Sequence, residues 1–488
     1  MLGFRSFEED RAARLWRESA AMKTAAPAAP SLTLAQVRAL WWQKQALGDV
    51  ARAGDLADVI GRSGWLRTLG GSDVYLAARA RWPGLTRAEL DAAVEAGALR
   101  VVPAARGCIY LVPGHIVADL MALNAEGWRK TTERELAKVG ASMKLVEALA
   151  EGVVEALARP LTTDALRKAM PAGAIPSFGD AGKKIGLSSP LPLALRLLEL
   201  DGRAERALEG GRLDTERYLW RRTKPAARAR RAGGEPLDAM VGAFLGFAAP
   251  VTLAEISAWS GRAQRELAPA LERLGAERVA VEEVGEAWAL PGDLEAARKA
   301  APPRGLTLLA FEDNYLALHG TGVVSDPRHH ALQIDLWGAG KPGSIGAARH
   351  VLSRTVVVDG MVAGFWEVDP RSGGGVWMTF DPAPPALARR IDEATGEAAR
   401  FLLDELGHAR VFSLDTMESV QERADRIAKL RGGGAATRAG KAIAAKQVRA
   451  PKAKAKPAKA KPAKAKAKAA KAKPAKAKPA KPAKKKTR

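Results

Sequence analysis

The sequence predicts an α+β fold of three consecutive helix-and-hairpin units, followed by a C-terminal α+β module and a disordered basic tail. Three times along the chain, apolar residues at helical spacing precede two short alternating segments that a glycine-containing turn joins. The chain has 488 residues, 47% of them hydrophobic, so it is long and apolar enough to form several domains. Helices followed by a two-stranded hairpin are the layout of a winged helix, a variant of the helix-turn-helix.

The first predicted winged-helix unit spans residues 31–115. We expect Ser31 or Thr33 to cap its first helix and a capping box at Thr86–Glu89 to begin its last helix. A turn at 104–107 joins the two strands of the hairpin. The expected elements are helices at 33–47, 75–82 and 86–96 and strands at 99–103 and 108–112.

The second and third predicted units, 140–224 and 236–293, repeat this order, and an α+β module follows at 304–425. A second capping box lies at Thr252–Glu255, and we expect Gly261 to turn the chain between two helices. The expected elements of the two units are helices at 146–158, 162–170, 191–200, 237–247, 252–259 and 263–274 and strands at 203–208, 217–220, 278–282 and 286–290.

The beginning of the chain and its single cysteine bear on the compartment. Residues 1–30 carry charges through their first half and contain no apolar core, so we expect them to be disordered and to be neither a signal peptide nor an anchor. No apolar run approaches the roughly 18–20 residues that cross a bilayer. Cys108 is the sole cysteine, which excludes an internal disulfide and a multi-cysteine zinc site. We therefore expect a cytoplasmic protein without membrane contact.

The positive charge of the chain is concentrated in its tail. Residues 431–488 contain 18 Lys and 4 Arg and no acid, whereas residues 1–430 carry 55 basic and 54 acidic side chains. The tail consists mostly of Lys, Ala and Pro, so it buries little and we expect it to be disordered. Repeated lysines on a flexible chain bind phosphates by releasing counterions, independently of base sequence. Its composition resembles the tails of linker histones and bacterial histone-like proteins; a solubilising or RNA-binding appendage is the alternative.

Several short motifs follow one another in a recognisable order along the body. They are Tyr75–Arg81, Arg106–Pro113, Pro250–Leu253, Ala258–Gly261, Leu309–Leu316 and Val356–Trp366. Together they resemble the bacterial winged-helix DNA-binding family that includes the AlkZ- and YcaQ-type DNA glycosylases, enzymes acting on bulky alkylated bases and interstrand crosslinks. The resemblance spans about residues 32–410 and implies a scaffold that binds double-stranded DNA.

The sequence departs from these glycosylases at their catalytic motif. They carry Gln-x-Gln or Gln-x-Asp shortly before the Tyr-Leu-Ala helix core, and counting back from Tyr75 without gaps places Arg67-Thr68-Leu69 there. Arginine opposes the positive charge that develops on the sugar, and leucine cannot orient a water. Gln43-Lys44-Gln45 spells the motif too early in the chain, and we interpret it as a polar helix face. Asp73 is a weak candidate for a general base, should the preceding loop shift the register.

Basic residues in hairpins, turns and helices of the body are candidate phosphate contacts. The densest group runs through the linker after the second hairpin and contains no acid; a linker that is basic for solubility is the alternative. An arginine at a hairpin turn, such as Arg106, is a natural backbone contact for a winged helix. The candidates are Arg62, Arg67, Arg79, Arg81, Arg106, Lys183, Lys184, Arg221, Arg222, Lys224, Arg228, Arg230, Arg231, Arg262 and Arg265.

We expect neither a metal nor a cofactor. His329 and His330 lie near Asp326 and Asp335, but Pro327 indicates a solvated loop rather than ligands on one helix face. Ser372-Gly373-Gly374-Gly375 is predicted to be a hairpin turn between Trp366 and Trp377, because no helix with Lys-Ser or Lys-Thr follows it as in a phosphate-binding loop.

We interpret the sequence as that of a double-stranded DNA-binding winged-helix protein of DNA repair or of the nucleoid, and we expect a monomer. An active DNA glycosylase that excises alkylated or crosslinked bases is the first alternative. A transcription regulator, which would need a defined operator, is the second. The sequence leaves open whether the protein is an enzyme.

Overall fold

A computed structural model describes residues 30–49, 54–215, 218–223, 234–336, 343–348 and 353–432. The chain divides into two units, Met1–Ala439 and Gly440–Arg488, and all described residues belong to the first. Three predictions fall outside these residues: the disordered N-terminus at 1–29, the linker from 224 to 233, and the tail after 432. No helix in the described part is both long and apolar enough to cross a membrane.

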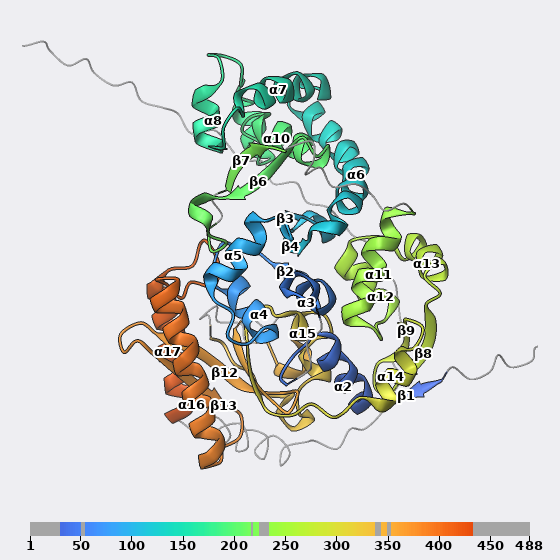
Figure 1. Cartoon of the computed structure of the whole chain (residues 1–488), viewed down its shortest axis with the longest axis vertical. Helices are drawn as coiled ribbons and strands as arrows, with labels where there is room; N and C mark the ends of the chain where they lie inside the picture. Colours follow the sequence, from blue (N-terminus) through green and yellow to red (C-terminus); the bar gives the residue numbers. More distant parts are fainter. Residues whose placement is uncertain are drawn as a thin grey trace, which may run out of the picture. The chain divides into compact units, whose positions relative to one another are not determined.

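The first hairpin unit contains three helices and a three-stranded sheet of order β2-β4-β3 (Figure 1). The predicted capping box at Thr86–Glu89 is present, and a further box at Asp55–Asp58 begins a helix that the sequence analysis did not assign. Its elements are α3 (Leu56–Ser63), β2 (Leu66–Arg67), α4 (Asp73–Arg81), α5 (Arg87–Glu95), β3 (Leu99–Pro103) and β4 (Ile109–Pro113).

The second unit repeats this sheet with order β5-β7-β6. A two-residue strand again pairs antiparallel with the second strand of the hairpin, Leu161 with Trp220 here and Leu66 with Leu111 in the first unit. Its elements are α6 (Val117–Lys138), α7 (Met143–Ala156), β5 (Leu161–Thr162), α8 (Thr163–Ala169), α9 (Gly179–Lys184), α10 (Leu191–Leu200), β6 (Ala204–Leu208) and β7 (Tyr218–Arg222).

The third unit includes the start of the described chain. Ser31 and Leu32 form β1, which pairs in parallel with β8, and the following helix donates from the Trp41 indole to the Pro250 carbonyl over 3.3 Å. The helix at 33–47 assigned from sequence to the first unit therefore packs on the third. The elements are β1 (Ser31–Leu32), α2 (Leu34–Lys44), α11 (Pro236–Ala248), α12 (Leu253–Ser260), α13 (Gln264–Arg273), β8 (Glu277–Val281), β9 (Gly285–Ala289) and α14 (Asp293–Lys299).

The C-terminal module is a four-stranded antiparallel sheet of order β10-β11-β12-β13 with two long helices beside β12 and β13 (Figure 1). Trp366 pairs directly with Trp377, so the segment Ser372–Gly375 lies at a hairpin turn as predicted. The elements are β10 (Leu306–Leu309), α15 (Asn314–Ala317), β11 (Arg354–Val358), β12 (Met361–Asp369), β13 (Gly374–Thr379), α16 (Pro385–Arg400) and α17 (Met417–Gly432).

The predicted start of the tail at residue 431 needs correction. Arg431 is part of α17, and its guanidinium lies 3.8 Å from the centre of the Trp377 ring. This contact between a cation and an aromatic face fixes the end of the helix on the sheet. Residues 431 and 432 therefore belong to α17 and not to the predicted tail.

Two hydrophobic clusters join the first unit to its neighbours. One contains Tyr75 and Leu90 of the first unit together with Trp366 and Phe401 of the C-terminal module. The other surrounds Trp65, which the first unit inserts among aromatic side chains of α11 and α12. The loop between β2 and α4 consequently lies where the first unit, the third unit and the C-terminal module meet.

Candidate functional site

The end of β2 and the loop that leads to α4 contain Arg67, Thr68 and Leu69, which counting back from Tyr75 assigned to the glycosylase motif. The C-terminal module holds it closely: Ser72 donates from its backbone N–H to the Arg410 carbonyl over 2.8 Å, and Ser413 donates to the Leu69 carbonyl over 2.8 Å. A Cβ on Gly71 would lie 2.3 Å from the backbone carbon of Val411, so only glycine fits this approach. The register of the loop is therefore fixed by its contacts.

Arg67 forms an ion pair with Glu312 at the mouth of a cavity of about 170 Å³. The Arg67 side chain is 29% exposed and that of Glu312 is 12% exposed. Glu312 has φ of 50°, a left-handed conformation that non-glycine residues seldom adopt and that often marks a functional position. The other polar or aromatic lining residues are Arg106, Tyr110, Glu255, Trp259, Asn314 and His319.

His319 and Tyr110 are the titratable side chains of this cavity most affected by burial. The His319 ring stacks on Trp41 at 3.6 Å, and neither ring nitrogen has a hydrogen-bond partner in the described part of the chain. Burial, and then the charge of Lys44, lower the pKa of His319 to about 3, so the ring is neutral. Burial also raises the pKa of Tyr110, which stays protonated. Neither side chain was singled out from sequence, where each resembles an ordinary core aromatic residue.

Asp73, the weak candidate for a general base, lies in the interior. Its carboxylate pairs with Arg354 at 2.5 Å and accepts a hydrogen bond from the Phe311 backbone N–H over 2.6 Å. Arg354 also pairs with Glu367, and these two carboxylates outweigh burial and raise its pKa. The carboxylate of Asp73 is thus occupied by structural partners.

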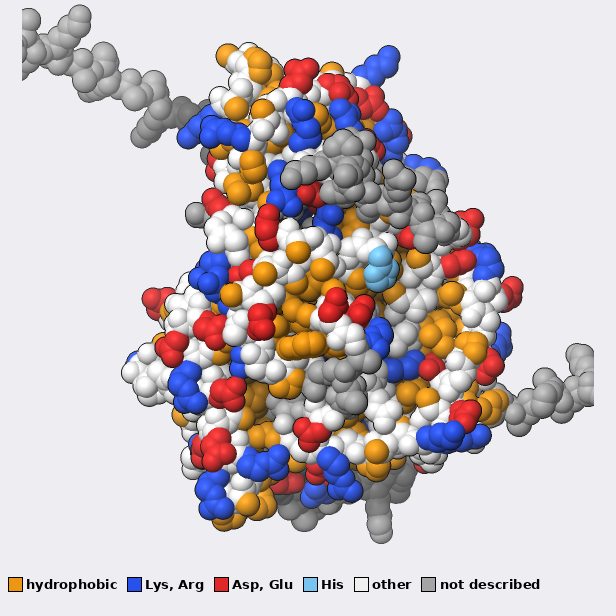
Figure 2. Space-filling model, in the orientation of Figure 1, with side chains coloured by type: hydrophobic (Ala, Val, Ile, Leu, Met, Phe, Trp, Pro, Cys, Tyr) orange, Lys and Arg blue, Asp and Glu red, His pale blue; other side chains and the backbone are white. Residues whose placement is uncertain are grey.

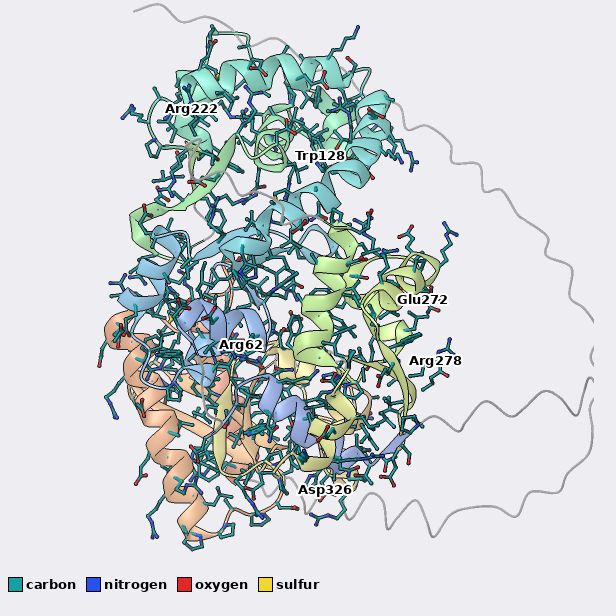
Figure 3. The ribbon with its side chains drawn as sticks, turned by 45° about the vertical axis from the view of Figure 1, so that its right-hand side comes forward. Arg62, Trp128, Arg222, Glu272, Arg278 and Asp326 are labelled. Atoms are coloured by element: carbon teal, nitrogen blue, oxygen red, sulfur yellow. The ribbon has the colours of Figure 1, made fainter. Side chains whose placement is uncertain are left out.

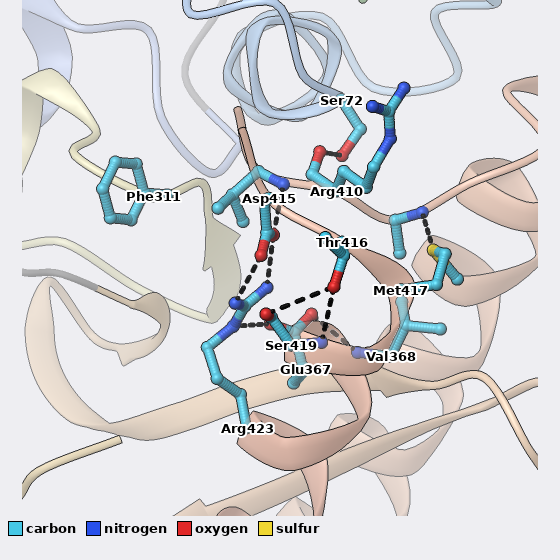
Figure 4. A network of polar contacts seen from close by, with 12 residues as sticks. Ser72, Phe311, Glu367, Val368, Arg410, Asp415, Thr416, Met417, Ser419 and Arg423 are labelled. Atoms are coloured by element: carbon cyan, nitrogen blue, oxygen red, sulfur yellow. Dashed lines mark hydrogen bonds and ion pairs between the residues drawn. The ribbon is translucent and has the colours of Figure 1, made fainter. Parts of the chain in front are cut away.

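Glu367 links Arg354 to a further set of contacts in α17, and Figure 4 shows Glu367, Arg423 and Asp415 together. Arg423 donates to Glu367 over 2.8 Å and pairs with Asp415 at 2.8 Å. All three side chains are at most 2% exposed. Because Asp415 also accepts from the Val411 backbone N–H over 3.0 Å, the network fixes the segment that clamps the β2–α4 loop.

Of two arginines proposed from sequence as phosphate contacts, one is buried and the other is partly buried. Arg81 is fully buried and forms hydrogen bonds of 2.7 and 2.9 Å to the two carboxylate oxygens of Asp313. Arg79 pairs with Glu397 at 2.9 Å and lies 4.3 Å from the Phe401 ring centre. The prediction for Arg81 is wrong, because a fully buried guanidinium cannot reach a phosphate, and Arg79 is engaged in packing.

The remaining candidates differ in their surroundings. Arg221 pairs with Glu205 at 2.7 Å and Glu95 at 2.9 Å, and Arg262 donates to the Leu123 carbonyl over 2.7 Å. Cations and acids are interspersed over the visible face, as expected for a nearly neutral body (Figure 2). The candidates that are exposed are Arg62, Arg106, Lys183, Lys184, Arg222 and Arg265; those outside the described residues are Lys224, Arg228, Arg230 and Arg231.

No group of three His, Cys, Asp or Glu side chains suited to a metal ion occurs among the described residues. His329, considered from sequence, instead lies 3.1 Å from the Asp381 carboxylate.

The fold and this arrangement can be compared with known proteins. The family model of the AlkZ-like DNA glycosylases matches residues 71–402, well over half of the chain. The chain therefore belongs to the AlkZ-like DNA glycosylase family. A solved structure, Streptomyces sahachiroi DNA glycosylase AlkZ, is similar with a TM-score of 0.56 and 22% sequence identity, covering 78% of this chain and 98% of that one. At this identity the likeness shows a shared fold. A comparison with curated proteins gives no match.

Proposed function

We propose that the protein binds double-stranded DNA through tandem winged helices and a basic tail, without the excision chemistry of a Gln-x-Gln glycosylase. Its place would be in DNA repair or at the nucleoid. The observation that carries this proposal is the ion pair of Arg67 with Glu312, with Leu69 two residues after Arg67, where counting back from Tyr75 predicts the catalytic motif. Membership of the AlkZ-like DNA glycosylase family supports DNA as the partner.

The repeated small sheets support the winged-helix part of the proposal. In two units a short strand, helices and a hairpin follow in the same order, and in the third Val251 makes the equivalent bridge to Trp288. Arg106 lies exposed in the turn between β3 and β4, the place of a wing. Wings commonly contact the DNA backbone, which positions the protein without reading sequence.

The charges at the motif position argue against the standard chemistry. Breaking a glycosidic bond builds positive charge on the sugar, which a glycosylase stabilises with a carboxylate or polar side chains, and it needs a positioned water. Arg67 carries the same sign as that developing charge, and it neutralises the nearest carboxylate, Glu312. The aliphatic side chain of Leu69 offers no hydrogen bond to a water.

An active DNA glycosylase remains the second candidate, and one observation favours it. Glu312 lines the cavity together with Glu255 and Asn314, so a carboxylate could meet a substrate there. If a DNA phosphate drew Arg67 away, Glu312 would lose this ion pair and its carboxylate could act as a base. A transcription regulator, the third candidate, would be revealed if selection from a random duplex library enriched one sequence.

Deleting residues 433–488 tests whether the tail contributes to duplex binding. We expect nonspecific duplex binding to weaken strongly at low salt. If about ten lysines meet phosphates, the slope of log K against log salt should fall in magnitude by about 9. Fluorescence anisotropy with a labelled duplex over a salt series measures this, and a tail of equal length with Lys replaced by Gln is the control. An unchanged affinity and slope would refute the role of the tail.

The protein without residues 433–488 allows the DNA contact of Arg106, in the turn between β3 and β4, to be tested separately from the tail. We expect it to bind duplex DNA weakly, and Arg106→Ala to lower that affinity by about three- to tenfold with a slope change near one phosphate contact. The matched control is Arg328→Ala, which removes another exposed arginine whose partners are Asp326 and Asp381. Equal losses in the two variants would count against a wing contact.

A further inference from the structure

A second cavity lies between α2, α3 and α11. Its volume is about 540 Å³, compared with about 170 Å³ for the cavity beside Arg67. Trp65 lines it, and the same indole packs 5.3 Å from the ring of Trp259 in the first cavity. Its size falls within the range of pockets that hold small molecules.

Small residues on facing helices create this hollow. Ala46, Ala57, Ala243 and Gly246 all line it. A Cβ built on Gly246 meets nothing within 4 Å, although the residue lies within α11 and does not have a left-handed φ. Glycine is unfavourable inside a helix, so its presence here keeps space open where a larger side chain would fit.

The polar lining contains a buried group with an unused hydrogen bond. Ser63 is 0% exposed, and its hydroxyl has no partner in the described part of the chain. A buried hydroxyl without a partner is costly, and by turning toward the cavity Ser63 would gain the missing bond from a ligand there. Gln43 of α2 also lines the cavity, and its side-chain amide can both donate and accept hydrogen bonds.

The charged lining residues differ in whether they can meet a ligand. Lys44 is paired with Asp293 at 2.8 Å and also donates to the Leu245 carbonyl over 3.0 Å. The Asp58 carboxylate accepts the Asp55 backbone N–H as part of a capping box. Arg62 and His115 also line the cavity, and both side chains are exposed. Arg62 is labelled in Figure 3. Because Asp293 neutralises Lys44, Arg62 at the opening is the cation of this lining that can meet an anionic group.

We propose that this cavity binds a single nucleotide. The base would lie against the apolar wall of Val59, Pro113 and Ile116, with its polar edge on Ser63 and Gln43 and its phosphate at Arg62. A planar ring with polar edges and one anionic group matches these three features together. The nucleotide could be free in solution or be the phosphorylated end of a DNA strand. This proposal does not depend on duplex binding by the wing or the tail.

Isothermal titration calorimetry of the full chain with each of the four deoxynucleoside 5′-monophosphates tests the proposal. We expect saturable one-to-one binding of at least one of them, and no comparable binding of inorganic phosphate. Gly246→Met should fill the cavity and weaken binding at least tenfold. The control Gly127→Met places the same side chain on another helical glycine whose Cβ position is also open, and it should bind as the wild type does.

A second pair of measurements keeps the test decisive if Gly246→Met does not fold. Arg62→Ala should weaken the monophosphate at least tenfold while leaving the corresponding nucleoside within about twofold. A 5′-phosphorylated trinucleotide that competes as well as the monophosphate indicates a strand end, and failure to compete indicates a free nucleotide. Absence of binding by all four monophosphates at millimolar concentration, or wild-type affinity in a folded Gly246→Met variant, would overturn the proposal.

Discussion

Two arginine–carboxylate pairs flank the β2–α4 loop, and their surroundings differ. Arg67 and Glu312 border a cavity and are 29% and 12% exposed. Arg354 and Asp73 are 0% and 7% exposed. Arg354 also pairs with Glu367, and Asp73 also accepts a hydrogen bond from the Phe311 backbone N–H. The comparison separates roles that sequence alone cannot: the Arg67–Glu312 pair borders a cavity, whereas Asp73 holds the C-terminal module onto the first unit.

The largest expected effect is a difference in the free energy of unfolding when the arginine of each pair is replaced. Arg354→Met would leave Asp73 buried without its cation and Glu367 with Arg423 alone, and it should lower the free energy of unfolding by about 3–5 kcal/mol. Arg67→Met, at the cavity, should lower it by about 1 kcal/mol or less. Urea denaturation followed by circular dichroism measures both. Equal losses would show that the two pairs are energetically alike and would break the comparison.

Asp73→Asn probes the buried pair more gently. Arg354 would keep Glu367, and the new amide oxygen could still accept from the Phe311 N–H, so we expect a loss of about 1–3 kcal/mol. Duplex affinity measured by anisotropy should stay unchanged, because Arg354 and the Phe311 N–H occupy the carboxylate. A stable variant with altered DNA binding or base release would return Asp73 to the functional site.

The smallest effect is a pH dependence arising at the cavity. The pKa of His319 is lowered by burial from 6.5 to about 3, so the unfolded chain binds this proton more readily than the folded protein. The stability that depends on neutral His319 is complete above pH 6.5 and is lost as the pH falls toward 3. His319→Phe keeps a ring on Trp41 without a titratable group, so its stability should fall less between pH 6.5 and 4.5. Parallel unfolding curves in the two proteins would refute this assignment.

The sequence predicted local elements well and distant partners poorly. Capping boxes at Thr86 and Thr252 and the hairpin around Ser372–Gly375 depend on neighbouring residues, and each is present. The pairing of Ser31 with Ala280 and the burial of Arg81 by Asp313 join residues more than 200 positions apart. No local pattern encodes such contacts, and a buried arginine in an amphipathic segment resembles an exposed one.

The candidate site shows the same limit. Counting residues placed Arg67 at the motif position, but its partner Glu312 lies 245 residues away. The stretch Leu309–Leu316 was noted only as a motif of the family. Glu255, Tyr110 and His319 come from three other segments, and only folding brings them to one cavity. The residues next to each of them in the sequence do not indicate that the three side chains meet.

The most direct test of the central claim is an excision assay on DNA carrying a bulky alkylated base. The wild-type protein is incubated with this duplex under conditions where anisotropy shows it to be bound, and abasic sites are then counted after alkaline cleavage. We predict binding without base release above the uncatalysed rate. Base release by the wild type that Glu312→Gln abolishes, while DNA binding is retained, would contradict the claim and establish an active glycosylase.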